Sequence, residues 1–253
     1  MELSADGIRA AHELGEYLKE HGDIKHIFTR YDIPPSPARK IHSRNVLCIN
    51  IYSYNDTYSC LAPNLVCLFV ADFLKTKPNS PFIRALNTAV LVSRDTGLSK
   101  VNIEDGITEW QTPALIGGDS PYQPPTVVDL IGRFPEINAK YESITKPSPF
   151  ETEEELVKRT GRIAGILADS VFPSNLLIVS HAPCSLGISL TFEGLDLKRK
   201  QESKLKPWPL GGLTQFTRDK VECPWTMELC NSTQHLSGHW KEGVQAWTLP
   251  SLR

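Results

Sequence analysis

The sequence predicts an α/β sandwich, because helical segments alternate along the chain with short apolar strands. Residues 4–20 and 152–167 place apolar side chains at helical spacing, residues 24–29 alternate as a strand does, and residues 176–179 form a short apolar run. A chain of 253 residues is long enough to bury a sizeable core, either in one large domain or in two small ones.

The composition is that of an ordinary soluble globular protein, with 40% hydrophobic residues, 22% charged residues and a net charge of −2. This balance gives no basic excess for nucleic acid, and the N-terminus lacks the pattern of a signal peptide. The apolar run over residues 65–71 is too short for a bilayer span, which takes about 20 residues. Six cysteines without CxxC spacing indicate neither zinc nor a disulfide framework. We therefore expect a cytoplasmic protein with no zinc site and no membrane or nucleic-acid partner.

The first element is a predicted helix over residues 4–20, capped by Ser4 or Asp6. His21 and Gly22 end it, and residues 24–29 follow as a short strand.

Residues 30–79 differ in kind from their surroundings, with neither helical nor alternating order. They hold half of the six cysteines and four of the seven tyrosines. Structureless loops longer than about 15 residues are uncommon inside compact domains. The composition therefore predicts an irregular insert.

Regular patterns return at Ser80 and continue to the C-terminal part of the chain. Pro81 suits the start of a helix with apolar residues at helical spacing. Further on, Thr152 is placed to cap a helix whose first turn is acidic. The remaining predicted elements are a strand over residues 101–103, a proline-punctuated loop region over 111–149, a strand over 176–179, a helix over 185–192 and a strand over 213–217.

Three side chains are candidates for chemistry. Arg84, on the first turn of its helix, suits a phosphate, although a surface arginine paired with a carboxylate is the simpler alternative. His181 follows a strand, where open α/β sheets place their ligands, or it is a histidine satisfied within a turn. Glu109 precedes Trp110, and a carboxyl beside an indole can be kept protonated as a general acid, or it is an ordinary exposed glutamate.

Taken together and in this order, the motifs resemble the histidine phosphatase superfamily, which has a phosphoglycerate-mutase-like fold. The resemblance is nearest to the branch that contains the phosphatase domain of the ubiquitin-associated and SH3 domain-containing proteins. It covers residues 1–29 and 80 to about 194. The segments that carry it are Leu3-Ser-Ala-Asp-Gly7, Ile27-Phe-Thr29, Ser80-Pro-Phe-Ile-Arg84, Glu104-Asp-Gly-Ile-Thr-Glu-Trp110, Phe134-Pro-Glu-Ile-Asn138, Tyr141, Phe150-Glu-Thr-Glu153, Arg159 and Ile178-Val-Ser-His181.

The resemblance implies a three-layer α/β/α sandwich that hydrolyses phosphomonoesters through a phosphohistidine intermediate. Arg84, with Ser80, would bind the phosphoryl oxygens, and His181 would bind them and stabilise charge in the transition state. Glu109 would protonate the leaving group, and neither metal nor cofactor would be needed. The expected substrate is a phosphoprotein or a small phosphate ester, with homodimerisation left open.

Two departures from the family pattern limit this expectation. No Arg-His-Gly, which carries the family's nucleophilic histidine, stands before Leu3. We therefore expect the first strand to be missing, which would leave either a gap in the sheet or an aggregation-prone edge. His12, His21 and His26 are poor substitutes on sequence grounds. Joining Thr29 to residue 80 restores the family's strand, turn and helix. Residues 30–79 are therefore either a gene-model artefact or a genuine lineage-specific loop.

The leading hypothesis is a single histidine-phosphatase-like domain over residues 1–253, truncated at its N-terminus and inactive or impaired. The alternative is a non-catalytic pseudophosphatase that binds phosphorylated or protein partners through Arg84 and His181. A small-metabolite mutase is the third option, which the absence of the mutase motifs after Glu109 disfavours.

Overall fold

The computed structural model describes residues 3, 5–23, 26–29, 50–51, 64–69, 83–98, 100–113, 120, 127–204 and 209–242. Its helices are α1 (Ala5–His21), α2 (Ile83–Thr96), α4 (Val127–Ile131), α5 (Glu153–Val171) and α6 (Ala182–Phe192), with 3-10 turns η1 (Asp105–Ile107), η2 (Leu197–Glu202) and η3 (Gly238–Glu242). Its strands are β1 (Gly22–Asp23), β2 (His26–Thr29), β3 (Asn50–Ile51), β4 (Asn64–Phe69), β5 (Val101–Ile103), β6 (Leu176–Ser180), β7 (Gly212–Thr217) and β8 (Thr226–Ser232).

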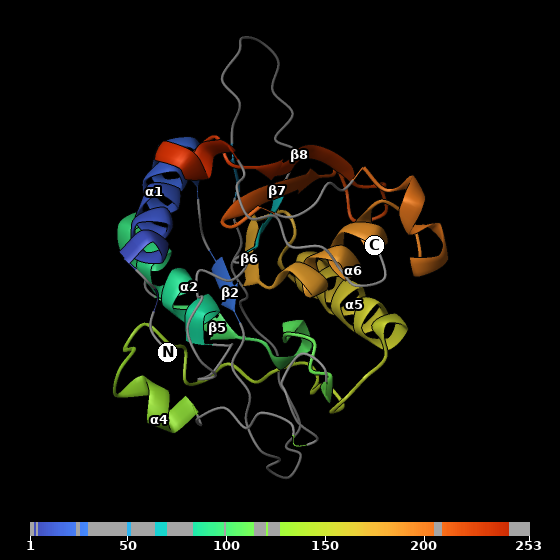
Figure 1. Cartoon of the computed structure of the whole chain (residues 1–253), viewed down its shortest axis with the longest axis horizontal. Coiled ribbons are helices and arrows are strands. Elements are labelled where there is room, and N and C mark those ends of the chain that lie inside the picture. The colour runs from blue at the N-terminus through green and yellow to red at the C-terminus, as the bar shows by residue number, and fades with distance from the viewer. Residues whose placement is uncertain are drawn as a thin grey trace.

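A six-stranded sheet in the order β5-β2-β6-β4-β7-β8 forms the centre of the molecule. Strands β5, β2, β6 and β4 are parallel, whereas β7 and β8 are antiparallel to their neighbours. Figure 1 shows α1 and α2 on one side of this sheet and α5 and α6 on the other. The predicted three-layer α/β/α architecture is confirmed.

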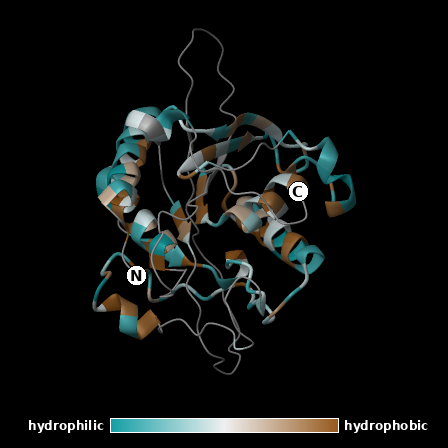
Figure 2. Cartoon of the chain, viewed as in Figure 1, coloured by the Kyte–Doolittle hydropathy of each residue, from teal (hydrophilic) through white to brown (hydrophobic). Residues whose placement is uncertain are grey.

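Two hydrophobic cores flank the sheet, because successive side chains of a strand point to opposite faces. Ile27 of β2 and Leu177 of β6 pack with α1 and α2, whereas Phe28 and Ile178, their next neighbours, pack with α5 and α6. Figure 2 shows hydrophobic residues on the central strands and hydrophilic residues along the outer sides of the helices. Both faces of the sheet are therefore covered, as a mostly parallel sheet requires.

Helices α5 and α6 approach each other closely at two glycines. A Cβ atom on Gly161 would collide with the hydroxyl of Thr191, and one on Gly187 would collide with the hydroxyl of Thr160. This contact holds α6 against α5, and α6 begins directly after His181.

Several predicted elements are confirmed in detail. Thr152 caps α5 through a capping box with Glu155, and the strands at 101–103, 176–179 and 213–217 are all present. Helix α6 begins at Ala182, three residues before the predicted start. Strand β8 was not predicted, because its seven residues are polar or only half-buried along most of their length. Among the described residues, no helix is both long and apolar enough to cross a membrane.

The prediction that residues 30–79 lack regular structure is wrong for residues 50–51 and 64–69. Residues 50–51 form β3, which is antiparallel to β1, and residues 64–69 form β4, which is parallel to β6 and antiparallel to β7. The expected gap in the sheet is therefore filled from within the segment. The physical reason is that the backbone donors and acceptors of β6 and β7 need a partner, and an apolar run supplies one. The prediction about Ser80 lies outside the described residues.

Deleting residues 30–79 should destabilise this chain rather than restore its fold. The deletion removes β4, which would leave the facing backbone groups of β6 and β7 unpaired. We expect loss of the cooperative urea unfolding transition followed by circular dichroism. Deleting only residues 31–49, which leaves β3 and β4 in the chain, is the matched control. Equal stability of the two deletions would show that β4 is dispensable.

Residue His26 makes the fold sensitive to acid. It lies at the start of β2 with 4% of its surface exposed, and its Nε2 atom has no hydrogen-bond partner within the described residues. Burial lowers its pKa to about 3. Below the ordinary histidine pKa of about 6.5, the unfolded chain takes up a proton that the folded chain refuses.

The free energy of unfolding should therefore fall as the pH drops below about 6.5, by about 1.4 kcal/mol per pH unit from this residue. His26→Leu should flatten the dependence between pH 6.5 and 4.5 in urea titrations. His21→Leu, at an exposed position, is the control and should leave the slope unchanged. The same slope in His26→Leu and in the unaltered chain would contradict the assignment.

Candidate active site

Arg84 occupies the second position of α2, and its side chain is nine-tenths buried. Its Nη2 atom donates to both carboxylate oxygens of Glu109, at 3.0 Å to Oε1 and 2.9 Å to Oε2. Because the guanidinium keeps its charge at every physiological pH, Arg84 supplies a fixed cation at the start of this helix.

Glu109 lies just after the turn that follows β5. The turn consists of η1 and Thr108, and Glu104 caps η1 by accepting a hydrogen bond from Gly106 N. The side chain of Glu109 is 19% exposed, so it is the most accessible member of the site. Because Glu109 directly follows this packed turn, its backbone position is fixed by the turn.

His181 links β6 to α6, where it holds the N-cap position. Its side chain is 2% exposed, and its Nδ1 atom lies 3.6 Å from Glu109 Oε2. That distance is longer than a direct hydrogen bond but within the range of charge interaction. Ser185 secures the backbone here, since both its N–H and its hydroxyl donate to the carbonyl of His181.

The parallel arrangement of the strands brings these groups together. Strands β5 and β6 flank β2 in parallel, so the residues after Ile103 and after Ser180 leave at the same edge of the sheet. Phe69, the last residue of β4, pairs with Ser180. The chain therefore also leaves β4 at this edge, next to His181. Open α/β sheets bind their ligands at the carboxyl ends of their strands.

A buried carboxylate, Glu104, anchors the turn before Glu109. Its oxygens accept hydrogen bonds from Gly106 N at 2.8 Å, Tyr141 Oη at 2.6 Å, Ser143 Oγ at 2.8 Å and Ile144 N at 2.9 Å. Burial, followed by the charge of Glu104, raises the pKa of Tyr141, so the phenol remains a donor. The turn is thus tied to the loop over residues 141–144.

Cys184 is close to the site and is not a nucleophile. Its Sγ atom donates to the carbonyl of Thr108 at 2.7 Å, and burial raises its pKa to about 11. The reactive form of cysteine is the thiolate, so this thiol is structural.

The structure brings together three of the four residues predicted for the site: Arg84, Glu109 and His181. Other histidines have different surroundings. His12 contacts Asp95 at 2.7 Å between α1 and α2, and His21 contacts the Tyr17 carbonyl at 2.9 Å.

His26 begins β2, at the opposite end of the strands from His181. None of the three histidines considered as substitute nucleophiles therefore lies beside Arg84 in the described structure.

Two features of the site were missed by the analysis of sequence alone. One is Glu104 as a hydrogen-bonding centre, and the other is a buried ion pair between Arg159 and Glu151 beside the same turn. All three residues lie in the motifs that carry the family resemblance, but nothing in the residue types shows that these charges are buried. In the described ranges, no group of three or more His, Cys, Asp or Glu side chains is arranged to hold a metal ion.

Comparison with known proteins gives matches among solved structures alone. No protein-family model matches the sequence, and no curated protein does. Ecdysone phosphate phosphatase from Bombix mori, solved with tungstate, is 13% identical, with a TM-score of 0.54 over 88% of this chain and 69% of that chain.

Two further solved structures have TM-scores below 0.5. Phosphoserine phosphatase from Entamoeba histolytica, solved with 3-phosphoglyceric acid, is 17% identical, with a TM-score of 0.48 over 93% of this chain and 87% of that chain. A mycobacterial glucosyl-3-phosphoglycerate phosphatase is 17% identical, with a TM-score of 0.41 over 67% of this chain and 99% of that chain. The likeness of fold therefore rests on the Bombix mori protein.

Replacing Glu104 by alanine should destabilise the protein strongly. The change leaves four donors, one buried and three partly buried, without their charged acceptor. Hydrogen bonds to charged groups each contribute about 1.5–3 kcal/mol. We expect the free energy of unfolding in urea to fall by about 3 kcal/mol or more. Glu142→Ala, at an exposed position in the neighbouring loop, is the control. A loss no larger than that of the control would show that Glu104 does not anchor the turn.

Proposed function

Because the chain has the histidine-phosphatase fold of phosphoglycerate-mutase-like type, we propose that it recognises a phosphate ester through Arg84 and His181. The two residues form the recognition part of a phosphomonoester-hydrolase site. The observation that carries the proposal is the convergence of Arg84, Glu109 and His181 from three separate elements: Glu109 Oε2 lies 2.9 Å from Arg84 Nη2 and 3.6 Å from His181 Nδ1.

The charges of Arg84 and His181 indicate the role of each residue. The guanidinium of Arg84 can hold two phosphoryl oxygens with its fork of donors. His181, at the N-terminus of α6, adds an imidazole where the helix field favours an anion. Positioning and charge stabilisation supply most of the barrier reduction in phosphoryl transfer. This pair therefore covers recognition and transition-state charge.

Glu109 affects phosphate binding as well, because its carboxylate already accepts hydrogen bonds from Arg84. A phosphate arriving at Arg84 must compete with this carboxylate or share the guanidinium with it. A phosphate there also places a second negative charge beside Glu109, which favours the neutral acid form of the carboxyl. The neutral acid is the form that could protonate a leaving alkoxide or phenoxide.

Hydrolysis also needs a nucleophile, which we looked for after the strand that ends beside His181. The resemblance implies a histidine that becomes phosphohistidine. Strand β4 ends beside Ser180, but the sequence over residues 70–82 that follows it contains no histidine. We infer that the chain turns over phosphate esters poorly or not at all. A phosphate-ester-binding pseudophosphatase is the second candidate, and this same observation favours it.

The substrate class is a phosphorylated protein or a small phosphate ester. The similar solved proteins are named for different esters, and a shared fold does not fix the leaving group. The proposal also includes the nearness to the ubiquitin-associated and SH3 domain-containing branch, a single domain and a cytoplasmic location, with homodimerisation left open.

Inorganic phosphate should bind the chain, and Arg84→Ala should weaken the binding at least about tenfold, the equivalent of one charged contact. Isothermal titration calorimetry measures the affinity. Arg94→Ala, at the exposed end of the same helix, is the control and should bind as the unaltered chain does. Equal affinities of the Arg84 and Arg94 variants would refute phosphate recognition at this site.

The assay with p-nitrophenyl phosphate separates the two candidates. We expect phosphate binding without measurable turnover. Turnover that disappears in both Arg84→Ala and His181→Ala would instead establish a working hydrolase, with a nucleophile outside the described residues.

Glu109→Gln should separate binding from chemistry. Removing the negative charge beside Arg84 should tighten phosphate binding about tenfold, while abolishing any acid-dependent turnover. Calorimetry on this variant gives the first quantity. Weaker binding would show that Glu109 supports the phosphate rather than competing with it.

A further inference from the structure

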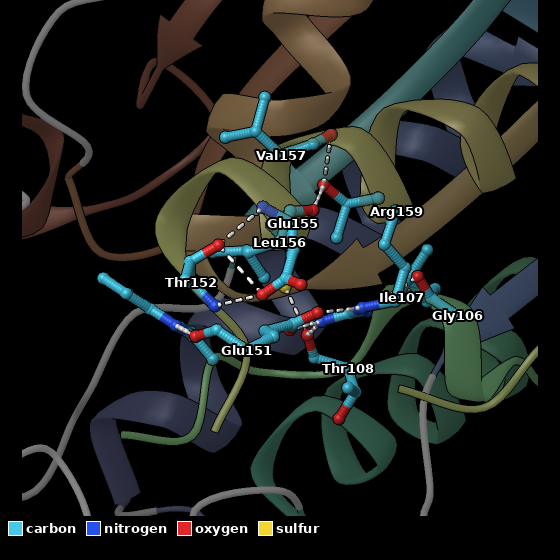
Figure 3. Close-up of polar contacts among 12 residues, drawn as sticks. Gly106, Ile107, Thr108, Glu151, Thr152, Glu155, Leu156, Val157 and Arg159 are labelled. Atoms are coloured by element: carbon cyan, nitrogen blue, oxygen red, sulfur yellow. Dashed lines mark hydrogen bonds and ion pairs between the residues drawn. The ribbon is translucent and has the colours of Figure 1, made fainter. Parts of the chain in front are cut away.

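A buried arginine, Arg159, hydrogen-bonds the turn that precedes Glu109. It projects from α5, and its side chain is 9% exposed. Its Nη1 atom donates to the carbonyl of Gly106 at 2.9 Å, and its Nη2 atom donates to the carbonyl of Thr108 at 3.3 Å. Figure 3 shows the guanidinium lying between this turn and the start of α5.

The contact with Thr108 bears directly on Glu109. The carbonyl of Thr108 and the amide nitrogen of Glu109 belong to one planar peptide unit. Holding that carbonyl therefore fixes the direction in which the backbone enters Glu109. Cys184 donates to the same oxygen at 2.7 Å, so α5 and α6 both hold this peptide.

The other side of Glu109 is held through the partner of Arg159. Arg159 Nε donates to Glu151 Oε2 at 2.9 Å, and its Nη2 also pairs with Glu151 Oε1. The backbone carbonyl of Glu151 in turn accepts a hydrogen bond from the indole of Trp110 at 2.8 Å. Both sequence neighbours of Glu109 are thus tied to the Arg159–Glu151 pair.

The start of α5 gives this pair a fixed base. Thr152 caps the helix, accepting from Glu155 N, and the Glu155 side chain accepts from the Thr152 N–H at 2.7 Å. Figure 3 shows these contacts next to Glu151. The pair therefore connects the first turn of a long helix with the turn that bears the carboxylate.

A gain in stability does not by itself explain why Arg159 and Glu151 are buried as an ion pair. Removing two charges from water is costly, and an apolar pair of similar volume is often as stable. What an apolar pair cannot do is hold two carbonyls in set directions with a planar fork of donors. The geometry points to a positional role.

We propose that Arg159 is a positioning residue that sets the Glu109 carboxylate against Arg84 and His181. The proposal rests on the proposed function of Arg84 as a phosphate site. Glu109 contacts Arg84, so releasing the turn should free Arg84 for an incoming anion. Arg84 lies on α2 and His181 lies at the β6–α6 junction. Ser180 Oγ and Cys184 Sγ, on either side of His181, donate to the carbonyls of Ile107 and Thr108, so the junction keeps its own contacts with the turn when the donors of Arg159 are removed.

The test is a double-mutant cycle on phosphate affinity. Arg159→Met, which keeps length but removes the donors, should tighten binding of inorganic phosphate several-fold in the unaltered chain. In the Glu109→Gln background the same change should have no effect, because the competing carboxylate is gone. Arg162→Met, at an exposed position on the same helix, should have no effect in either background. Equal effects of Arg159→Met in both backgrounds, or none in the unaltered chain, would overturn the proposal.

Two further variants separate position from stability. Arg159→Met with Glu151→Leu removes both buried charges, so its melting temperature should recover while its phosphate affinity stays altered. Arg159→Lys keeps a charge without the fork and should not restore the affinity of the unaltered chain. Recovery of affinity together with stability in the double variant would reduce Arg159 to a structural role.

A second readout remains if the unaltered chain binds no phosphate, which would refute the proposed function alone. The indole N–H signal of Trp110, assigned through Trp110→Phe, and the amide signal of Glu109 report the turn in ¹⁵N-resolved NMR spectra. Arg159→Met should shift both signals and Arg162→Met neither. Unshifted signals in Arg159→Met would overturn the positional role whether or not phosphate binds.

Discussion

The parallel register of the central strands is the constraint on which the site depends. Strands β5, β2, β6 and β4 run in one direction, so every segment that leaves their carboxyl ends does so at the same edge. Residues far apart in sequence, Glu109 and His181, meet there without any direct connection. Helix α2 adds Arg84 from the layer that covers one face. A reversed strand would carry its side chain to the opposite edge, and no local adjustment could return it.

Alignment of strands places the backbone only approximately, and buried charges complete the placement. Glu104 holds the turn from the side of residues 141–144, and Arg159 holds it from α5. Glu109 lies beyond both anchors, partly exposed, with its charge directed at Arg84. Burying Glu104 and Arg159 is tolerable because each is paired or surrounded by donors and acceptors. The hydrogen bonds and ion pairs of Glu104 and Arg159 thus offset the free energy of burying their charges, and the same contacts orient the turn before Glu109.

The sequence was informative where a signal is local. Thr152 with Glu155, the proline before α2 and the apolar run before His181 each identify their element from a few residues. Arg84 and His181 could be proposed because each follows such a signal, and Glu109 because it stands beside Trp110. Strand β4 could not be predicted in this way, because a short apolar run does not reveal which strands it pairs with. Its partners β6 and β7 lie more than a hundred residues further along the chain. The burial of Glu104 and Arg159 is equally a property of distant neighbours.

A site assembled from separate strand ends can lose one group and keep the others in place. Arg84, Glu109 and His181 are each fixed by their own element and by contacts within the described structure. None of these contacts requires a nucleophile. The electrostatics that would stabilise a transferring phosphoryl group are the same that bind a phosphate ester at rest, since fixed donors and charges act on both. Recognition by these three residues is therefore physically independent of a covalent step, and this independence is why phosphate binding is the property proposed for this chain.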